Sequence, residues 1–136
     1  MEHRLTHGFV EAVTTFSNEV RAELRAHAER AFPAECVGAL LGTGTEVLFT
    51  RALENVAPEP RAHFEVSARE YLALEREAEA RRLSVRGFYH SHPHGPATPS
   101  AEDAAHALPG QVMVIVPVFD GVAAELQCFR FEGASP

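Results

Sequence analysis

Two short, almost continuous apolar runs constrain the fold of this chain most strongly. They are ECVGALLG at residues 35–42 and QVMVIVPV at residues 111–118, and both are typical of buried β-strands. Neither approaches the ~20 apolar residues that a membrane-spanning helix needs. Because buried strands need other elements to cover them, the sequence predicts a sheet at the centre of the domain.

The segments around these runs predict helices and further strands. Ser17 is a candidate N-cap for a helix over residues 18–31, and Ser67 and Glu70 form a capping box that opens a helix to about Arg82. Further strands are expected over residues 46–53, 85–92 and 121–131, a short helix over residues 100–108, and no firm element over residues 1–16. Because helices alternate with or flank the strands, the predicted fold class is mixed α/β: a single domain over residues 1–136 with a central mixed β-sheet flanked by helices.

Composition and charge limit the partners and the location of the chain. Its 136 residues carry a formal net charge of −7, which argues against nucleic acid, whose phosphates would repel it. No segment predicts a membrane partner, and residues 1–13 lack the apolar core of a signal peptide, so we expect a cytoplasmic protein. Cys36 and Cys128 lie in apolar stretches and are predicted to be reduced core residues. The sequence makes no prediction of oligomeric state.

Residues 90–103, HSHPHGPATPSAED, contain the most informative motif. On a strand, His90 and His92 project from the same face, about 6.5 Å apart along the backbone. Two imidazoles that lean together can approach the ~3.3 Å that separates the ligand atoms of tetrahedral zinc. The Pro-rich loop turns the chain back, so that Asp103 at the start of the next helix can supply a third ligand. Two histidines and a carboxylate leave the fourth position open for water, as in catalytic zinc sites.

Parts of this motif have alternative interpretations. Ser100-x-x-Asp103 is also a helix capping box, and we expect this role of Asp103 to compete with metal binding. The same ligands could hold iron or manganese in place of zinc. His94 is interpreted as a loop residue near the substrate groove, and His106 as a weaker candidate for a substitute ligand. The remaining histidines belong to no motif and are not predicted to take part: His3, His7, His27 and His63.

Two separate motifs resemble the signature of the JAMM (MPN+, Mov34/PAD-like) metalloisopeptidase family. The first is His-Ser-His-Pro, followed after seven residues by Ser100 and after two more by Asp103. The second is PAECVGALLG at residues 33–42, where the family has Pro-x-Glu-x-x-Gly-x-Leu-x-Gly. Together with the elements between them, the motifs cover most of the chain. The resemblance implies a JAMM/MPN-like fold with a cytidine-deaminase-like architecture.

The resemblance also implies a mechanism. One Zn²⁺ per chain is held by His90, His92 and Asp103, and Glu35 is the general base that takes a proton from zinc-bound water. Ser100 donates a hydrogen bond to the developing oxyanion.

The substrate that the resemblance implies is a ubiquitin-like or sulfur-carrier protein, cut at the amide bond after its C-terminal Gly-Gly tail. Only seven residues separate Asp103 from Gln111, which resembles the compact prokaryotic members of the family. Two alternatives stay open: a non-catalytic MPN-type scaffold module, and a zinc amidohydrolase that acts on other small amides.

Overall fold

Seven strands, three α-helices and one 3₁₀-helix make up the part of the chain that the computed structural model describes, residues 6–44 and 46–133. His3 lies outside these residues. The helices are η1 (Thr6–Gly8), α1 (Asn18–Ala31), α2 (Ala68–Arg81) and α3 (Ala101–His106). The strands are β1 (Phe9–Glu11), β2 (Val37–Thr43), β3 (Glu46–Leu53), β4 (Ser84–His92), β5 (Val112–Phe119), β6 (Val122–Ala123) and β7 (Gln127–Phe131).

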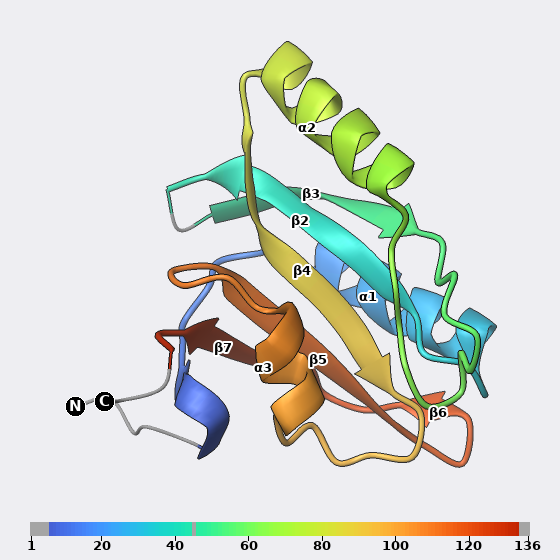
Figure 1. Ribbon diagram of the computed structural model, residues 1–136. Coiled ribbons are helices and arrows are strands. Elements are labelled where there is room, and N and C mark those ends of the chain that lie inside the picture. The colour runs from blue at the N-terminus through green and yellow to red at the C-terminus, as the bar shows by residue number, and fades with distance from the viewer. Residues whose placement is uncertain (1–5, 45, 134–136) are drawn as a thin grey trace.

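The strands form one mixed sheet in the order β1-β7-β5-β4-β2-β3, with β6 paired to β5 outside this path. Only β4 and β5 pair in parallel among the described strands, and the chain between them passes through α3. In Figure 1, α1 lies behind the sheet, whereas α2 and α3 lie in front of it. The predicted mixed α/β class and the central sheet flanked by helices are confirmed.

Burial on both faces explains the two continuous apolar runs. In β5, Val114 and Val116 pack on the face that α1 covers, whereas Met113 and Ile115 pack beneath α3. Successive side chains of a strand point to opposite faces, so a strand that is covered on both sides is apolar at every position.

The two long helices begin where the sequence predicts. The Ser17 hydroxyl accepts a hydrogen bond from the backbone N–H of Val20 (3.1 Å), as expected of an N-cap. Ser67 caps α2 in the same way, through the N–H of Glu70 (3.2 Å). The predicted capping box is only half formed, because the Glu70 carboxylate accepts from the backbone N–H of Glu54 (2.7 Å) instead. This bond ties the start of α2 to the end of β3.

The C-terminal and N-terminal strands differ from the prediction. The single strand expected over residues 121–131 is divided into β6 and β7, because the register against β5 shifts by one residue between them: Ala123 lies opposite Val118, whereas Gln127 lies opposite Ile115. The weakly patterned N-terminal segment contains β1, which pairs with β7 from Phe9 to Glu11. A strand of three residues is too short to show a period of two, which is why the sequence pattern did not reveal it.

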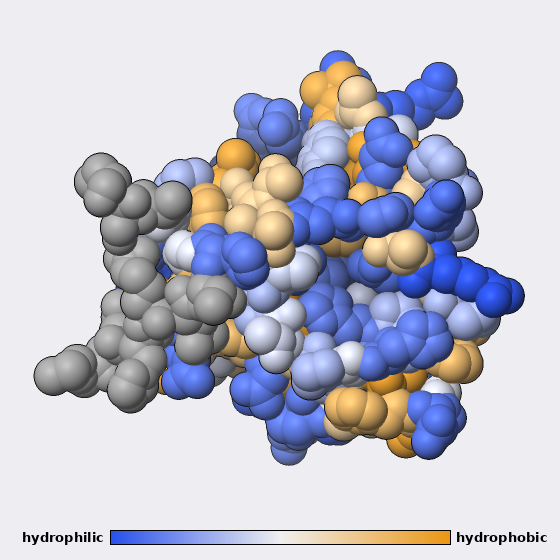
Figure 2. Space-filling model, turned by 60° about the horizontal axis from the view of Figure 1, so that its bottom comes forward, coloured by the Kyte–Doolittle hydropathy of each residue, from blue (hydrophilic) through white to orange (hydrophobic). Residues whose placement is uncertain are grey.

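The surface is mixed in character. On the face shown in Figure 2, hydrophilic residues extend across the middle and apolar residues gather in separate patches. Within the described ranges of the chain, no helix has both the length and the apolar character to cross a membrane.

Candidate metal centre

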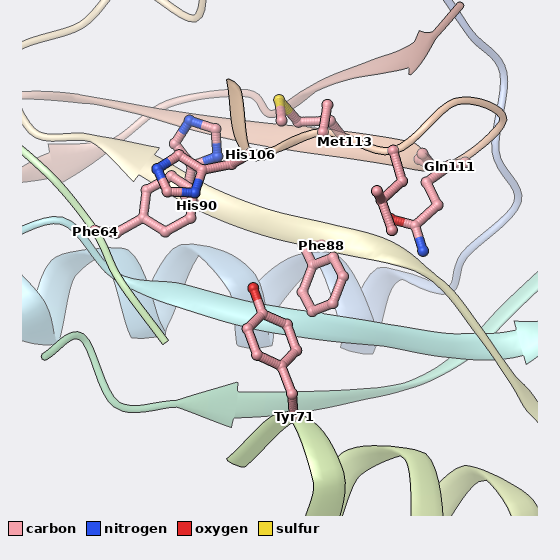
Figure 3. Close-up of a pocket in the computed structure, with 10 residues that line it drawn as sticks. Phe64, Tyr71, Phe88, His90, His106, Gln111 and Met113 are labelled. Carbon is pink, nitrogen blue, oxygen red and sulfur yellow. The ribbon is translucent and has the colours of Figure 1, made fainter. Parts of the chain in front are cut away.

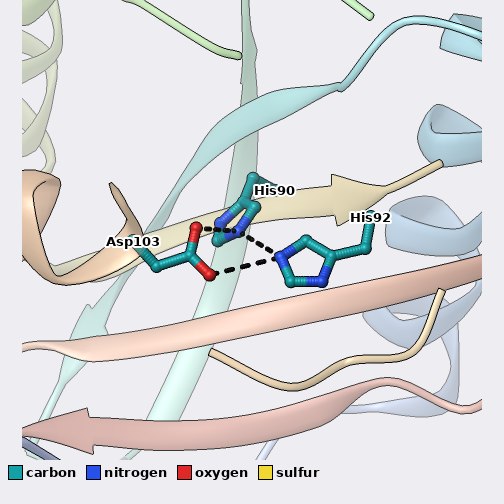
Figure 4. Close-up of side chains that lie close together, drawn as sticks. All are labelled: His90, His92 and Asp103. Atoms are coloured by element: carbon teal, nitrogen blue, oxygen red, sulfur yellow. Dashed lines mark hydrogen bonds and ion pairs between the residues drawn. The ribbon is translucent and has the colours of Figure 1, made fainter. Parts of the chain in front are cut away.

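The three predicted metal ligands converge at the end of β4 and the start of α3 (Figure 4). Nε2 of His90 lies 2.9 Å from Oδ1 of Asp103, and Nε2 of His92 lies 3.2 Å from Oδ2. The two Nε2 atoms are 3.2 Å apart. These separations are close to the ~3.3 Å edges of a tetrahedron of zinc ligands.

The hydrogen bonds of His92 indicate that the cluster fits a cation. The Pro96 carbonyl, 2.7 Å from Nδ1 of His92, can only accept, so Nδ1 carries a hydrogen. Nε2 faces an oxygen of Asp103, which is also an acceptor, so this pair is satisfied either by a proton on Nε2 or by a cation between the two atoms. A cation between these electron-rich atoms satisfies all of them, and imidazole nitrogens with a carboxylate oxygen are common zinc ligands. The residues present therefore fit zinc.

Burial and charge shift the protonation of all three side chains. His90 is 1% exposed, and burial lowers the pKa of its imidazole. Burial also disfavours charge on His92, but its contacts with Asp103 and the Pro96 carbonyl outweigh this and raise its pKa. Burial alone would raise the pKa of Asp103, yet hydrogen bonds from both histidines hold it well below its usual range. The Asp103 carboxylate is therefore ionised, and its negative charge faces the imidazoles of His90 and His92.

The Asp103 carboxylate completes the predicted capping box and also faces both histidines. Oδ2 of Asp103 accepts from the Ser100 backbone N–H (2.8 Å), and the Ser100 hydroxyl accepts from the Asp103 N–H (3.1 Å). The carboxylate still presents Oδ1 to His90 and Oδ2 to His92. The capping box thus fixes the rotamer that brings the carboxylate to the histidines.

Glu35 lies beside this cluster as a result of strand register. β2 and β4 are antiparallel with Val37 opposite His90, so continuing the register by two residues places Glu35 opposite His92. Glu35 is 9% exposed. Burial raises the pKa of its carboxyl to about 8, although the charge of His92 acts in the opposite direction. A carboxyl group with a pKa near neutrality is suited to exchanging protons.

Two residues of the motifs keep β2 and β4 in place. Ser91 points to the face opposite the histidines, where it is fully buried and its hydroxyl accepts from the Cys36 N–H (2.8 Å). Gly38 lies against the ring of Tyr89, and a Cβ atom there would overlap that ring. The glycine of the upstream motif therefore allows the strand that follows Glu35 to pack beside β4.

Ser100 is placed at the entrance of the site rather than in its interior. It is the exposed N-cap of α3, one turn before Asp103 in the chain. Because its oxygen accepts the capping hydrogen bond, the hydroxyl hydrogen remains available to donate.

The other histidines in the described part of the chain lie outside the cluster of His90, His92 and Asp103, but several have contacts that the sequence did not predict. His106 packs against the Phe64 ring (centroids 4.5 Å apart). Nδ1 of His63 lies 2.5 Å from a carboxylate oxygen of Glu102, next to Asp103. His94 lies in the exposed loop after β4, edge-on to the ring of Phe32.

A mostly apolar pocket adjoins the cluster on the side of His90 (Figure 3). It lies between the start of α2, the end of α3 and strands β4 and β5. Phe64, Tyr71, Phe88 and Met113 form much of its wall. Phe64 also stacks on His90, with ring centroids 4.9 Å apart. The site therefore has an apolar flank at His90 and an acidic flank at Glu35.

Sequence reasoning missed the residues that support the cluster from the loop between β3 and α2. Phe64 is buried and contacts His90, and Asn55 binds the backbone of Glu35. The available signal was weak: a Pro-rich segment, NVAPEPRAHF, that contains one buried-type aromatic residue and one turn-forming Asn.

Comparisons with known proteins support the same fold. A family model for prokaryotic homologues of the JAB domain matches residues 17–132. A solved JAB1/MPN domain protein from Archaeoglobus fulgidus superposes with a TM-score of 0.58, covering 91% of this chain and 94% of its own, at 19% identity. That likeness concerns the fold alone.

Two curated relatives are similar in sequence. A desampylase of Haloferax volcanii is 38% identical over 86 residues, which cover 61% of this chain and 62% of the desampylase. The match thus spans less than two thirds of that relative. A probable TtuB-protein conjugate cleaving protease of Thermus thermophilus is 38% identical over 104 residues, covering 76% of this chain and 69% of the relative.

Proposed function

This chain belongs to the family of prokaryotic homologues of the JAB domain, and we propose that it is a zinc metallopeptidase that acts on ubiquitin-like proteins. The bond that it hydrolyses is the amide after the C-terminal Gly-Gly tail of a ubiquitin-like or sulfur-carrier protein. The names of the relatives from Haloferax volcanii and Thermus thermophilus support this substrate class.

The observation that carries the proposal is the convergence of His90, His92 and Asp103 with Glu35 beside them. Two imidazoles and one carboxylate leave a coordination position open, which is the arrangement of catalytic rather than structural zinc sites. A non-catalytic scaffold has no need of a buried carboxyl group with a raised pKa next to three metal ligands.

The residues have separate roles in the proposed reaction. Zinc bound by His90, His92 and Asp103 would supply a Lewis acid that makes water more acidic and polarises the substrate carbonyl. Glu35 takes a proton from the attacking water and later gives it to the leaving amine, so the proton balance closes within one turnover. Ser100 donates its hydroxyl hydrogen to the oxygen of the substrate carbonyl as negative charge develops there.

Burial of the site favours a narrow, flexible chain over a bulky one. His90 and Asp103 are buried, and Glu35 beside them is 9% exposed. Glycines are the residues whose backbone can pass closest to such a centre, since they have no Cβ. This supports a Gly-Gly tail over larger residues at the scissile bond.

The test is hydrolysis of a ubiquitin-like protein that carries an amide-linked group after its Gly-Gly tail. Wild-type protein loaded with zinc should release the group, and Glu35→Ala should keep its zinc and lose hydrolysis. Glu75→Ala is the matched control, because Glu75 is exposed on α2 and remote from the cluster in the chain.

The alternatives give different results in the same assay. A zinc amidohydrolase would cleave small peptide amides but leave the protein conjugate intact. A scaffold module would cleave neither substrate, and the Glu35→Ala substitution would then have no effect on any measured rate. Turnover that survives Glu35→Ala would remove Glu35 from the mechanism.

A further inference from the structure

The backbone of Glu35 is not held by the sheet. β2 begins only at Val37, so Glu35 lacks the ladder hydrogen bonds that fix the residues after it. Its N–H donates to the Pro60 carbonyl (2.8 Å), and its carbonyl accepts from Nδ2 of Asn55 (2.9 Å). Both backbone groups of Glu35 therefore depend on the loop between β3 and α2.

One side chain organises that loop. Nδ2 of Asn55 donates to the carbonyls of Glu35 and His63, each at 2.9 Å, with the Pro60 carbonyl further away at 3.5 Å. Oδ1 of Asn55 accepts from the N–H groups of Ala57 (3.0 Å) and Glu65 (3.1 Å). The amide thus uses two donors and two acceptor positions at once, and its partners leave a single orientation of the amide group.

Neither aspartate nor serine can replace this amide. Aspartate has the same shape but no donors, so a second acceptor would face the carbonyls of Glu35 and His63. Serine is too short and has only one hydrogen to donate. An unsatisfied or mismatched group at a half-buried position costs about 1–3 kcal/mol, which is enough to displace a loop.

The same loop reaches the other side of the cluster. His63, whose carbonyl binds Asn55, contacts Glu102 of α3 through its imidazole. Phe64 follows it and stacks on His90. The hydrogen bonds of Asn55 therefore connect Glu35, on one side of the cluster, to the segment that carries Phe64 on the other side.

We propose that Asn55 is a positioning residue, which fixes the backbone of Glu35 and thereby directs its carboxylate to the site formed by His90, His92 and Asp103. This role rests on the function proposed above. Asn55 does not touch substrate or metal, and it acts through Glu35.

The experiment compares Asn55→Asp with Asn18→Asp, the same chemical change at the exposed first residue of α1. Zinc content, kcat and KM are measured for each on the ubiquitin-like conjugate, and again in a Glu35→Gln background. Asn55→Asp should lower kcat by about 10- to 100-fold with zinc retained and little change in KM. In the Glu35→Gln background it should have no further effect on the residual rate, because Asn55 acts through the carboxylate that is already removed.

Asn55→Ser is the milder variant in case Asn55→Asp does not fold, and it should give a smaller fall in kcat. An equal loss of rate with and without Glu35, or a loss of zinc, would overturn the proposal in favour of a general structural role. An unchanged kcat in both Asn55 variants would also overturn it.

A second readout needs no substrate. The backbone N–H of Glu35 donates to the Pro60 carbonyl in the loop that Asn55 organises, so its hydrogen exchange reports whether this backbone is held. Exchange of the Glu35 N–H, followed by NMR, should be faster in Asn55→Asp than in wild type and unchanged in Asn18→Asp. Unchanged exchange in Asn55→Asp overturns the positioning role, whereas faster exchange without any hydrolysis by wild type contradicts only the proposed function.

Discussion

Asp103 makes two contributions that substitution can separate. Asp103→Asn keeps a side-chain oxygen that can accept from the Ser100 N–H, so the cap is largely preserved, but it removes the charge that faces His90 and His92. Ser100→Ala removes the hydroxyl that caps the N–H of Asp103 and leaves the carboxylate. One variant therefore tests the metal-ligand role and the other tests the capping role.

The expected magnitudes differ clearly. At free zinc 1,000-fold above Kd, binding to the folded state should stabilise wild type by ~4 kcal/mol, or about 15 °C in Tm for a domain of this size. Ser100→Ala should start ~1 kcal/mol lower, because α3 loses its N-cap, yet keep nearly the whole zinc-dependent increase. Asp103→Asn should lose most of that increase.

The assay is thermal unfolding of each protein with a chelator and with buffered zinc, together with elemental analysis. Each variant is compared with itself, so a change in its metal-free stability does not affect the result. A full zinc-dependent increase in Asp103→Asn, or none in wild type, would refute the assignment of this cluster as a metal site. Asp103 would then be a helix cap alone.

Two further predictions concern Glu35 and Ser100. In metal-free protein, burial raises the pKa of Glu35 from 4.5 to about 8, so the folded state retains a proton that the unfolded chain has lost. The free energy of unfolding should therefore fall as the pH rises from about 4.5 to 8, by ~3–5 kcal/mol, and Glu35→Gln should abolish that part of the decline. Urea unfolding at pH 5 and pH 8 measures this, and an equal decline in both proteins would contradict it. Ser100→Ala should slow turnover of the conjugate by about 10²-fold or more with zinc retained, as for the loss of an oxyanion donor, whereas an unchanged rate would leave Ser100 as a helix cap only.

Local patterns predicted much of the fold because they reflect local causes. The start of α1 follows from a hydroxyl that caps a free N–H, and the continuous apolar run of β5 follows from cover on both faces. The division of residues 121–131 depends on a one-residue shift of register against β5. Pairing with another strand leaves no periodic pattern of apolar residues within the segment itself.

The same distinction between local and distant causes applies to the residues of the candidate site. The spacing of His90, His92 and Asp103 is set by one strand, one loop and one helix, so the sequence could predict that they converge. The supporting residues Asn55 and Phe64 could not be predicted, because their partners, Glu35 and His90, lie in other segments. The expected competition between capping and metal binding by Asp103 stays a prediction, but the geometry allows both roles, because the capped carboxylate also faces His90 and His92.

The position of β4 has a consequence for how long a bound ion would stay. β4 lies between β2 and β5 in the interior of the sheet, so His90 and His92 move away only when much of the domain opens. Asp103 belongs to α3, a helix of six residues that depends on its cap. Fraying of α3 is therefore the easiest opening, and the residence time of the ion would be governed by this helix rather than by the strand. Asp103 would then be the first ligand to release and the last to engage, and an ion bound by the cluster would exchange on this side of the site.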